Sequence, residues 1–187
     1  MERDTELSGM ATTFTGLFLS ASGGLLLAHA GDSRAYLLRR SAMSRETRDD
    51  SFVQLLVDSG VVRAADAASH PQRNVITSSL HGADDDVVVL AEREARVGDR
   101  WLLCSDGITD YVPDQAIATL LDDGDPTTAA HAIVEFALAA GSRDNVTAVV
   151  CDVVAEALWP SSVLFRGAAE DLELALLDED EDDLESA

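Results

Sequence analysis

The start of the chain has the apolar runs and short polar breaks that are typical of β-strands. Residues 10–19 and 25–30 are mostly apolar, and the residues between them are small and include Gly23 and Gly24. Turn-forming residues between two such runs indicate a β-hairpin. Residues 34–39 predict a third strand, and the polar residues 41–47 predict a loop.

A helical segment is expected next. Residues 49–58 carry apolar side chains along one helical face, with Asp50 as a suitable N-cap and Gly60 as a suitable stop. A short second helix is expected over residues 64–68, and a loop over residues 69–74. The pattern therefore predicts a helical excursion between two groups of strands.

The second half of the chain combines further strands with a pair of helices. Asp125 is expected to cap the second of these helices and Gly141 to end it. Strands that come in clusters and helices that come in pairs favour an α+β fold over strict βαβ alternation. The expected strands are residues 87–90, 100–104 and 146–154, and the expected helices are residues 114–121 and 126–140.

Composition indicates a globular domain with an acidic surface. The chain has 187 residues, of which 47% are hydrophobic and only 5% aromatic, so Ala, Val and Leu must build the core. Its formal net charge of −22 repels nucleic acid and anionic membranes, and neither is an expected partner. Cys104 and Cys151 lie in apolar runs and are expected to be reduced core thiols.

The character of the chain changes after Trp159 and Pro160. Ten acidic residues and no basic ones follow between Glu170 and Glu185. We therefore expect a domain over residues 1–158 and an acidic, flexible tail over residues 159–187. The tail is interpreted as a solubilising segment, with docking to a basic partner as the alternative.

An uncharged stretch near the N-terminus raises the question of a membrane segment. Residues 7–31 carry no formal charge, but they contain several Ser, Thr and Gly residues and fit a hairpin better than a spanning helix. The first four residues are net acidic, which argues against a signal peptide. A cytoplasmic protein is expected.

Three aspartates follow one design. Asp32 comes directly after an apolar strand, Asp106 comes just after another, and Asp144 precedes the last. Carboxylates at strand ends can converge on one point, and their oxygens are the ligands that Mg²⁺ and Mn²⁺ prefer. Each aspartate taken alone is more typical of a turn residue than of a metal ligand, and spacing by itself does not decide between the two interpretations.

Five local strings of the sequence form an ordered set. They are Gly9–Thr13, Ala28–Arg34, His70–Thr77, Leu103–Asp110 and Arg143–Thr147. Together they resemble the signatures of the PPM (type 2C) family of metal-dependent protein serine/threonine phosphatases, in its bacterial form. The resemblance covers about residues 7–154.

The resemblance implies a fold, a chemistry and a set of site residues. The family fold is a β-sandwich of two antiparallel sheets flanked by helix pairs. By resemblance, Asp106 and Asp144 match ligands of a binuclear Mn²⁺ or Mg²⁺ centre, Asp32 matches a ligand of a third metal, and Asn74 lies near that third site. Phosphorylated proteins are the implied substrates, and a serine/threonine kinase is an implied partner.

Two histidines are expected to be structural. His29 lies on a strand among apolar residues, and His70 precedes a proline in a loop. Neither matches the general-acid histidine of the family.

The sequence departs from the family pattern at its N-terminal side. The phosphate-binding arginine, the Asp-Gly-x-Gly-Gly-His-like motif and its general-acid histidine do not occur, so no catalytic residue is assigned here. Ser78 and Ser79 also stand where members often have an arginine. We expect an N-terminally incomplete domain with little activity by itself. The alternative is a non-catalytic pseudophosphatase that binds phosphoproteins or kinases as a regulatory module.

Overall fold

The computed structural model describes residues 9–19 and 24–155 of the chain. The chain divides into two units, residues 1–154 and 155–187, and the described strands and helices all lie in the first. The segments after residue 155, including the acidic tail expected over residues 159–187, lie outside the described residues.

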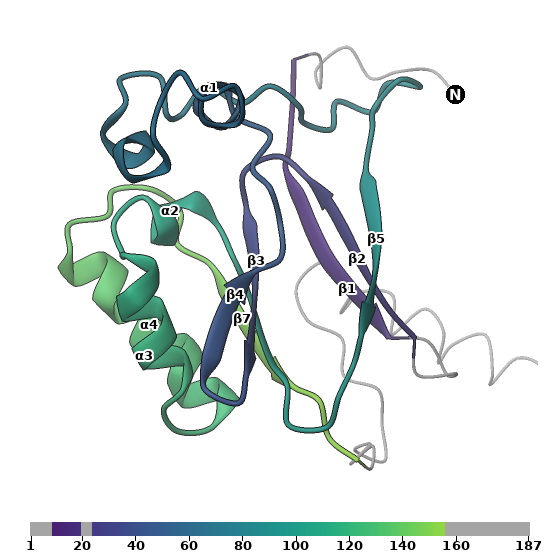
Figure 1. Cartoon of the computed structure of the whole chain (residues 1–187), viewed down its shortest axis with the longest axis vertical. Coiled ribbons are helices and arrows are strands. Elements are labelled where there is room, and N and C mark those ends of the chain that lie inside the picture. The colour runs from purple at the N-terminus through teal and green to yellow at the C-terminus, as the bar shows by residue number, and fades with distance from the viewer. Residues whose placement is uncertain (1–8, 20–23, 156–187) are drawn as a thin grey trace, which may run out of the picture. The chain divides into compact units, whose positions relative to one another are not determined.

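Seven strands form two antiparallel sheets that face each other as layers (Figure 1). The α+β class and the sandwich of two antiparallel sheets are thereby confirmed. One sheet has the order β1-β2-β5, with β1 at Phe14–Leu19, β2 at Gly24–Ala30 and β5 at Val89–Glu94. The other has the order β4-β3-β6-β7, with β4 at Ala42–Arg45, β3 at Arg34–Arg39, β6 at Arg100–Cys104 and β7 at Ala148–Asp152.

Apolar side chains from both sheets fill the space between the layers. Leu25 of β2, Leu37 of β3 and Trp101 of β6 are buried in one cluster, with Leu17 of β1 packed against it. Since successive side chains of a strand point to opposite faces, their neighbours in sequence lie on the outer faces of the two sheets.

A helix pair covers the outer face of the four-stranded sheet. The helices α3 (Asp114–Leu121) and α4 (Pro126–Ala139) pack their buried Ile117 and Ile133 against Tyr36 and Leu102 of that sheet (Figure 1). The expected cap is confirmed, because the carboxylate of Asp125 accepts hydrogen bonds from the first backbone amides of α4. This cluster is the larger of the two in the described core and anchors the strands that lead to the site.

The prediction of a loop over residues 41–47 is wrong. Residues Ala42–Arg45 form β4, which pairs with β3 through a tight turn at Arg40 and Ser41. Both turn residues have positive φ, 53° and 60°, a conformation that neither residue type signals in a sequence. The strand is polar because it lies at a sheet edge and is largely exposed.

The first helical segment also differs in detail. Helix α1 spans Phe52–Asp58 and its N-cap is Ser51, whose hydroxyl accepts from the backbone amide of Gln54. The carboxylate of Asp50, the expected cap, instead accepts from the backbone amide of Gly31. The second short helix is the 3₁₀ helix η2 (Ala64–Ser69), close to its expected position.

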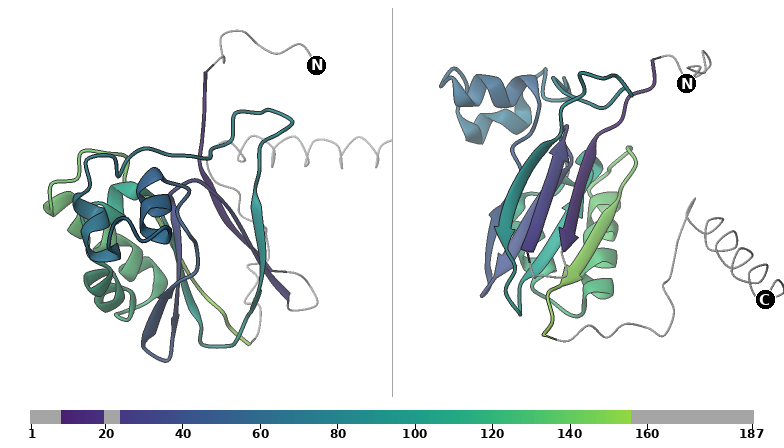
Figure 2. Two further views of the ribbon diagram at one scale, coloured as in Figure 1. Left: turned by 45° about the horizontal axis from the view of Figure 1, so that its top comes forward. Right: turned by 90° about the vertical axis from the view of Figure 1, so that its right-hand side faces the viewer.

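Helices α1 and η2 lie beyond one end of the strands, as the right-hand view in Figure 2 shows. The four-residue helix α2 (Asp106–Thr109), which the sequence pattern does not predict, follows β6 at the same end (Figure 1). Strand β5 begins two residues later than expected and runs four residues further, and β7 is shorter than expected at both ends.

The two cysteines have different surroundings. Cys104 is buried in the core, as expected, and burial raises the pKa of its thiol to about 12. Cys151 on β7 is exposed, so its prediction as a core thiol is wrong; both are free. Within residues 9–19 and 24–155 no helix is long and apolar enough to cross a membrane.

Candidate functional site

Sheet register brings the three candidate aspartates to one end of the four-stranded sheet. Arg34 at the start of β3 pairs with Cys104 at the end of β6, and Cys104 pairs in turn with Ala148 at the start of β7. Asp32 and Asp106 each lie two residues beyond this row, and Asp144 lies four residues before Ala148. Residues 74 and 38 positions apart in sequence thus come to the same end of the sheet.

The loops that carry Asp106 and Asp144 are tied together by close backbone packing. Gly107 lies so near the second loop that an added Cβ would be 2.4 Å from the carbonyl oxygen of Asn145. The hydroxyl of Ser105 donates to the same carbonyl at 3.0 Å. The Ser-Asp-Gly string therefore has a structural reason, because only glycine permits this approach.

A second glycine positions Asp32. Gly31 has a φ of 108°, and an added Cβ would be 2.4 Å from the side chain of Thr13. Its amide donates to the Asp50 carboxylate at 3.0 Å, and its carbonyl accepts from the Asp50 amide at 2.7 Å. The turn that presents Asp32 is therefore fixed both to the strand entry on one side and to the segment leading into α1 on the other.

The clustered carboxylates repel one another. Partial burial and then the charge of Asp106 raise the pKa of Asp32 to about 6. Burial, and then the charges of Asp144 and Asp110, raise the pKa of Asp106 above its ordinary value. A group of carboxylates with these properties is one that a bound cation would relieve.

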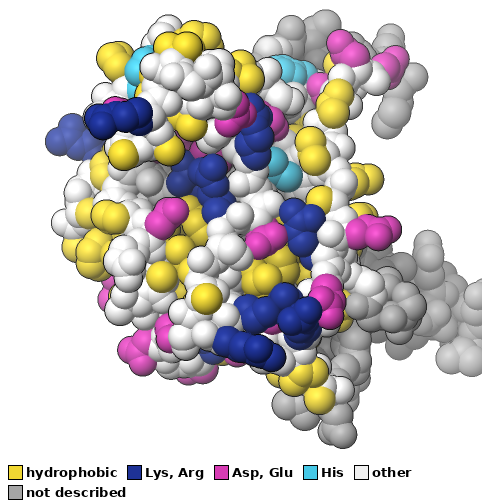
Figure 3. Space-filling view, viewed as in Figure 1, with side chains coloured by type: hydrophobic (Ala, Val, Ile, Leu, Met, Phe, Trp, Pro, Cys, Tyr) yellow, Lys and Arg dark blue, Asp and Glu magenta, His cyan; other side chains and the backbone are white. Residues whose placement is uncertain are grey.

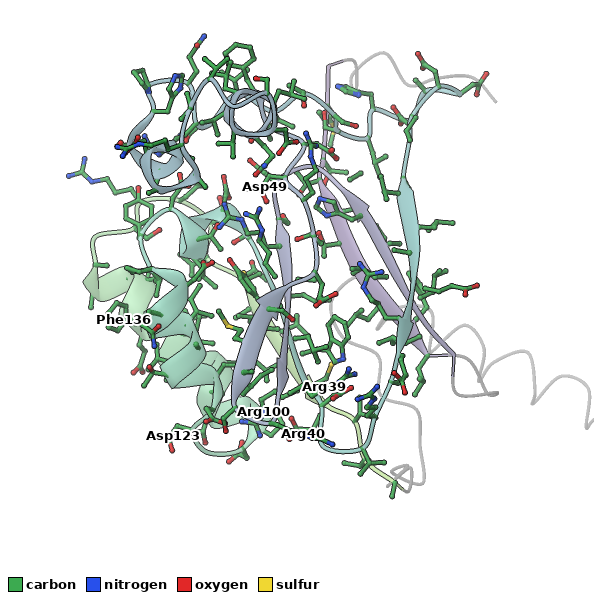
Figure 4. The ribbon with its side chains drawn as sticks, in the orientation of Figure 1. Arg39, Arg40, Asp49, Arg100, Asp123 and Phe136 are labelled. Carbon is green, nitrogen blue, oxygen red and sulfur yellow. The ribbon has the colours of Figure 1, made fainter. Side chains whose placement is uncertain are left out.

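A buried ion pair holds the base of the site. Arg34 donates to both carboxylate oxygens of Asp49, with Nε at 3.0 Å from Oδ1 and Nη2 at 2.7 Å from Oδ2. The same guanidinium donates to the hydroxyl of Tyr36 at 3.3 Å, and that hydroxyl donates to Asp114 at 3.0 Å. Asp49 lies below α1 at the site end of the strands (Figure 4).

A hollow of about 430 Å³ opens beside the aspartates. Asp32, Asp106 and Asp110 line it, together with apolar side chains of α1 and η2. Three arginines, Arg34, Arg45 and Arg73, contribute positive charge. The remaining lining residues are Asp49, Ser51, Val53, Gln54, Val57, Ala64, Ala67, Ala68, Thr109, Val112, Pro113 and Asp114.

The surface around this region is mixed in charge. On the face shown in Figure 3, arginine side chains lie among acidic ones and apolar patches, without a broad area of a single sign. Specificity for an anionic ligand would therefore depend on individual arginines rather than on a general field.

The other residues considered in the sequence analysis, one asparagine and two histidines, lie in different surroundings. Asn74 is exposed in the turn after η2, and its neighbour Arg73 lines the hollow instead, so a role for Asn74 stays a prediction. His29 is buried and bonded through its ring nitrogens to Thr15 and the Arg48 carbonyl, and His70 accepts from the Gln72 amide. These hydrogen bonds give both histidines a place in the local structure, as expected for structural residues.

The candidate aspartates share one end of the sheet but do not form a tight cluster. Among the described residues, no three His, Cys, Asp or Glu side chains come close enough to form a ready metal site. The sequence pattern also gives no role to Asp49, Asp110 and Arg73. Asp110 belongs to the family-like string Leu103–Asp110, whereas Asp49 has no local signal and Arg73 becomes a candidate only through its tertiary contacts.

Fold and site together define a two-layer α+β sandwich with an acidic centre at one end of its strands and a hollow beside it. No protein-family model matches the chain. Individual proteins do. The serine/threonine protein phosphatase PstP of Mycobacterium tuberculosis is 47% identical over 154 residues, which is 82% of this chain and 30% of PstP. The serine/threonine phosphatase Stp of Listeria innocua is 31% identical over 153 residues, 81% of this chain and 60% of Stp.

Solved structures agree. The catalytic domain of PstP in complex with two manganese ions superposes with a TM-score of 0.71 at 44% identity, covering 78% of this chain and 60% of that one. The chain belongs to the bacterial PPM family of protein serine/threonine phosphatases. It spans 30% to 60% of the length of these relatives.

Proposed function

We propose that this chain forms part of a metal-dependent phosphatase that hydrolyses phosphoserine and phosphothreonine in proteins. The observation that carries the proposal is the position of Asp32, Asp106 and Asp144 at one end of the four-stranded sheet, where Asp32 and Asp106 line a hollow, in a chain similar to serine/threonine phosphatases along most of its length. A serine/threonine kinase whose products are dephosphorylated is the corresponding partner in signalling.

The donor set fits Mn²⁺ or Mg²⁺. These hard cations take carboxylate oxygens and keep several waters, and the site offers carboxylates with no thiol or imidazole among its lining residues. Asp106 and Asp144 are the proposed ligands of the main centre, and Asp32 with Asp106 the proposed ligands of a further ion. When bound, such ions supply a more acidic water and neutralise phosphoryl charge.

The residues of the chain itself have three tasks in this scheme. The contact between Gly107 and Asn145 sets the spacing of the two loops that present Asp106 and Asp144. The hollow holds the phosphorylated segment next to these carboxylates. The ion pair of Arg34 with Asp49 keeps the segment before α1 in place. Positioning of this kind is where a phosphatase site gains most of its rate.

We further propose that the 187-residue polypeptide by itself is weakly active. No general-acid histidine or phosphate-binding arginine of the family pattern is found in the sequence, and the described carboxylates do not form a group of three. Fewer ligands around paired cations leave their mutual repulsion less compensated, so the affinity for a second ion falls.

The test is Mn²⁺ binding by calorimetry, together with phosphate release from a phosphothreonine peptide. Asp144→Asn is the test variant. Asp123→Asn is the matched control, because Asp123 is exposed in the α3–α4 loop at the far end of the strands (Figure 4). We expect Mn²⁺ binding in the parent and in the control, and in Asp144→Asn the loss of the ion of the main centre, so that only the ion proposed for Asp32 and Asp106 can remain.

The outcomes separate the alternatives. Mn²⁺-dependent turnover that Asp144→Asn abolishes supports a phosphatase. Peptide binding without Mn²⁺ binding or turnover favours the pseudophosphatase. Mn²⁺ binding that Asp144→Asn leaves intact would show that the assigned ligands are wrong.

A further inference from the structure

The three arginines of the hollow differ in how firmly they are held. The guanidinium of Arg34 donates three hydrogen bonds to Asp49 and one to Tyr36. Arg45 lies 3.8 Å from Asp49 and donates to the side-chain amide of Gln54. The guanidinium of Arg34 is thus held by contacts within the protein, and that of Arg45 is held by fewer and weaker ones.

Arg73 is the loosely held member of the three. Its Nε is 3.5 Å from Oδ2 of Asp110, which is too long for a strong hydrogen bond, and this is its one ion pair within the described part of the chain. The two side chains are 38% and 26% exposed, so the pair contributes little to stability. Arg73 can therefore exchange Asp110 for another anion at small cost.

The position of Arg73 places that exchange at the site. It lies in the turn after η2 and lines the same hollow as Asp32 and Asp106. Asp110, its present partner, is near enough to both aspartates for its charge to act on them. An anion bound by Arg73 would therefore lie beside the carboxylate centre without occupying it.

The hollow is larger than a phosphoryl group requires. Its volume of about 430 Å³ lies in the range of pockets that hold a whole small ligand, about 300–1,000 Å³. Val53, Val57 and Ala67 add apolar side chains to its lining. It has room for residues that flank a phosphorylated side chain as well as for that side chain.

We propose that Arg73 is a specificity-determining residue that binds a second anionic group next to the phosphorylated serine or threonine. The preferred substrates are then segments in which an acidic residue, or a second phosphorylated residue, is a close neighbour. Arginine suits this role because its planar guanidinium bonds carboxylate and phosphate oxygens in pairs. The proposal rests on the proposed function only for the placement of the phosphoryl group at the carboxylate end.

The experiment measures binding of three fluorescent phosphothreonine peptides to the full chain in the presence of Mn²⁺, by anisotropy. The peptides differ at one neighbouring position, which carries Gln, Glu or a second phosphothreonine. The variants are Arg73→Gln and Arg73→Lys. Arg63→Gln is the matched control, because Arg63 lies in the same segment, is 83% exposed, pairs with Asp66 and does not line the hollow.

We expect the parent to bind both doubly anionic peptides about fivefold to tenfold more tightly than the Gln peptide, from one charge-assisted contact. Arg73→Gln should lose that preference and leave binding of the Gln peptide unchanged, while Arg73→Lys should keep part of it. A preference for the phosphothreonine neighbour alone would identify a second phosphoryl group, rather than a carboxylate, as the ligand.

Two results would overturn the proposal. One is an equal loss of affinity for all three peptides in Arg73→Gln, which is the behaviour of a residue that only shapes the turn. The other is a preference that survives in Arg73→Gln or disappears equally in Arg63→Gln.

Repeating the binding with Asp144→Asn separates this proposal from the proposed function. Loss of turnover with the Arg73-dependent preference retained keeps the two independent. If turnover is measurable, Arg73→Gln should raise KM for the Glu peptide and leave kcat unchanged, because the contact is equal in the bound and reacting states.

Discussion

Replacing Asp32 by Asn should stabilise the metal-free protein at neutral pH. Burial and the neighbouring Asp106 raise the pKa of Asp32 from an ordinary 3.8 to about 6, so its ionised form is disfavoured in the folded state. Removing the charge removes that penalty. The gain should come at the cost of cation binding, since Asp32 is one of the proposed ligands.

The size of the stability gain expected for Asp32→Asn follows from the difference between the folded and unfolded pKa values of Asp32. The difference between 3.8 and about 6 corresponds to about 3 kcal/mol, at 1.36 kcal/mol for each pH unit. Asp32 is only partly buried, and screening by water reduces the expected gain to about 1–2 kcal/mol.

The raised pKa of Asp32 makes its effect on the free energy of unfolding depend on pH. Between pH 3.8 and 6 the folded state holds a proton on Asp32 that the unfolded state has released, so this group lowers stability as the pH rises through that window. The advantage of Asp32→Asn should be full at about pH 7.5 and nearly absent at about pH 4.

Urea denaturation with EDTA at these two pH values measures the effect, with Asp123→Asn as the control for loss of one exposed carboxylate. A gain below about 0.3 kcal/mol at the higher pH, or an equal gain at both pH values, would refute the reasoning about burial and repulsion. In saturating Mn²⁺ the difference in unfolding free energy between Asp32→Asn and the parent should become smaller or change sign. The reason is that Mn²⁺ binding stabilises the parent by about 2.7 kcal/mol at a hundredfold excess over Kd.

Two further substitutions probe the frame of the site. Gly107→Ala places a methyl group 2.4 Å from the Asn145 carbonyl oxygen. We expect the free energy of unfolding in urea to fall by about 1–3 kcal/mol and Mn²⁺ binding in calorimetry to become weaker. Unchanged values for both would contradict the packing argument. Asp49→Asn removes the charge that pairs with Arg34 in a partly buried contact and should cost about 1.5–3 kcal/mol in the same denaturation assay. Its control is Asp152→Asn, whose carboxylate is 32% exposed in its pair with Arg100 and should cost less than about 1 kcal/mol, so equal losses would show that burial of the carboxylate is not the cause.

The parts of the fold that can be predicted well from the sequence are those set by local contacts. Asp125 and Pro126 define the start of α4 because an N-cap bonds amides only two and three residues away. Strands β3 and β6 have their predicted bounds because their apolar runs lie in the centre of a sheet.

The failures involve contacts that sequence distance hides. Asp50 and Ser51 are both good N-cap residues, and the choice between them is made by the Gly31 amide, which recruits the Asp50 carboxylate from 19 residues away. Strand β4 resembles a loop because it is polar, and its pairing with β3 depends on a turn without glycine. Cys151 resembles a core residue because an apolar run does not reveal which face of an edge strand is open.

The candidate site also contains residues that the sequence identifies and residues that it does not. Asp32, Asp106 and Asp144 can be identified because each belongs to a string that resembles a family motif, although no spacing rule joins them. Arg73 belongs to such a string as well, yet the resemblance gives it no task.

The contrast between the two ends of the sandwich bears on how the site was built. The core under α3 and α4 is made of fully buried Ile and Leu side chains and needs no charge to hold it. At the other end the fold keeps glycines in close backbone contact, a buried ion pair and carboxylates with raised pKa values. Each of these costs stability or tolerance to substitution, and a turn residue alone would need none of them. Their concentration at Asp32 and Asp106 therefore supports the proposed cation site over an interpretation as three unrelated turns.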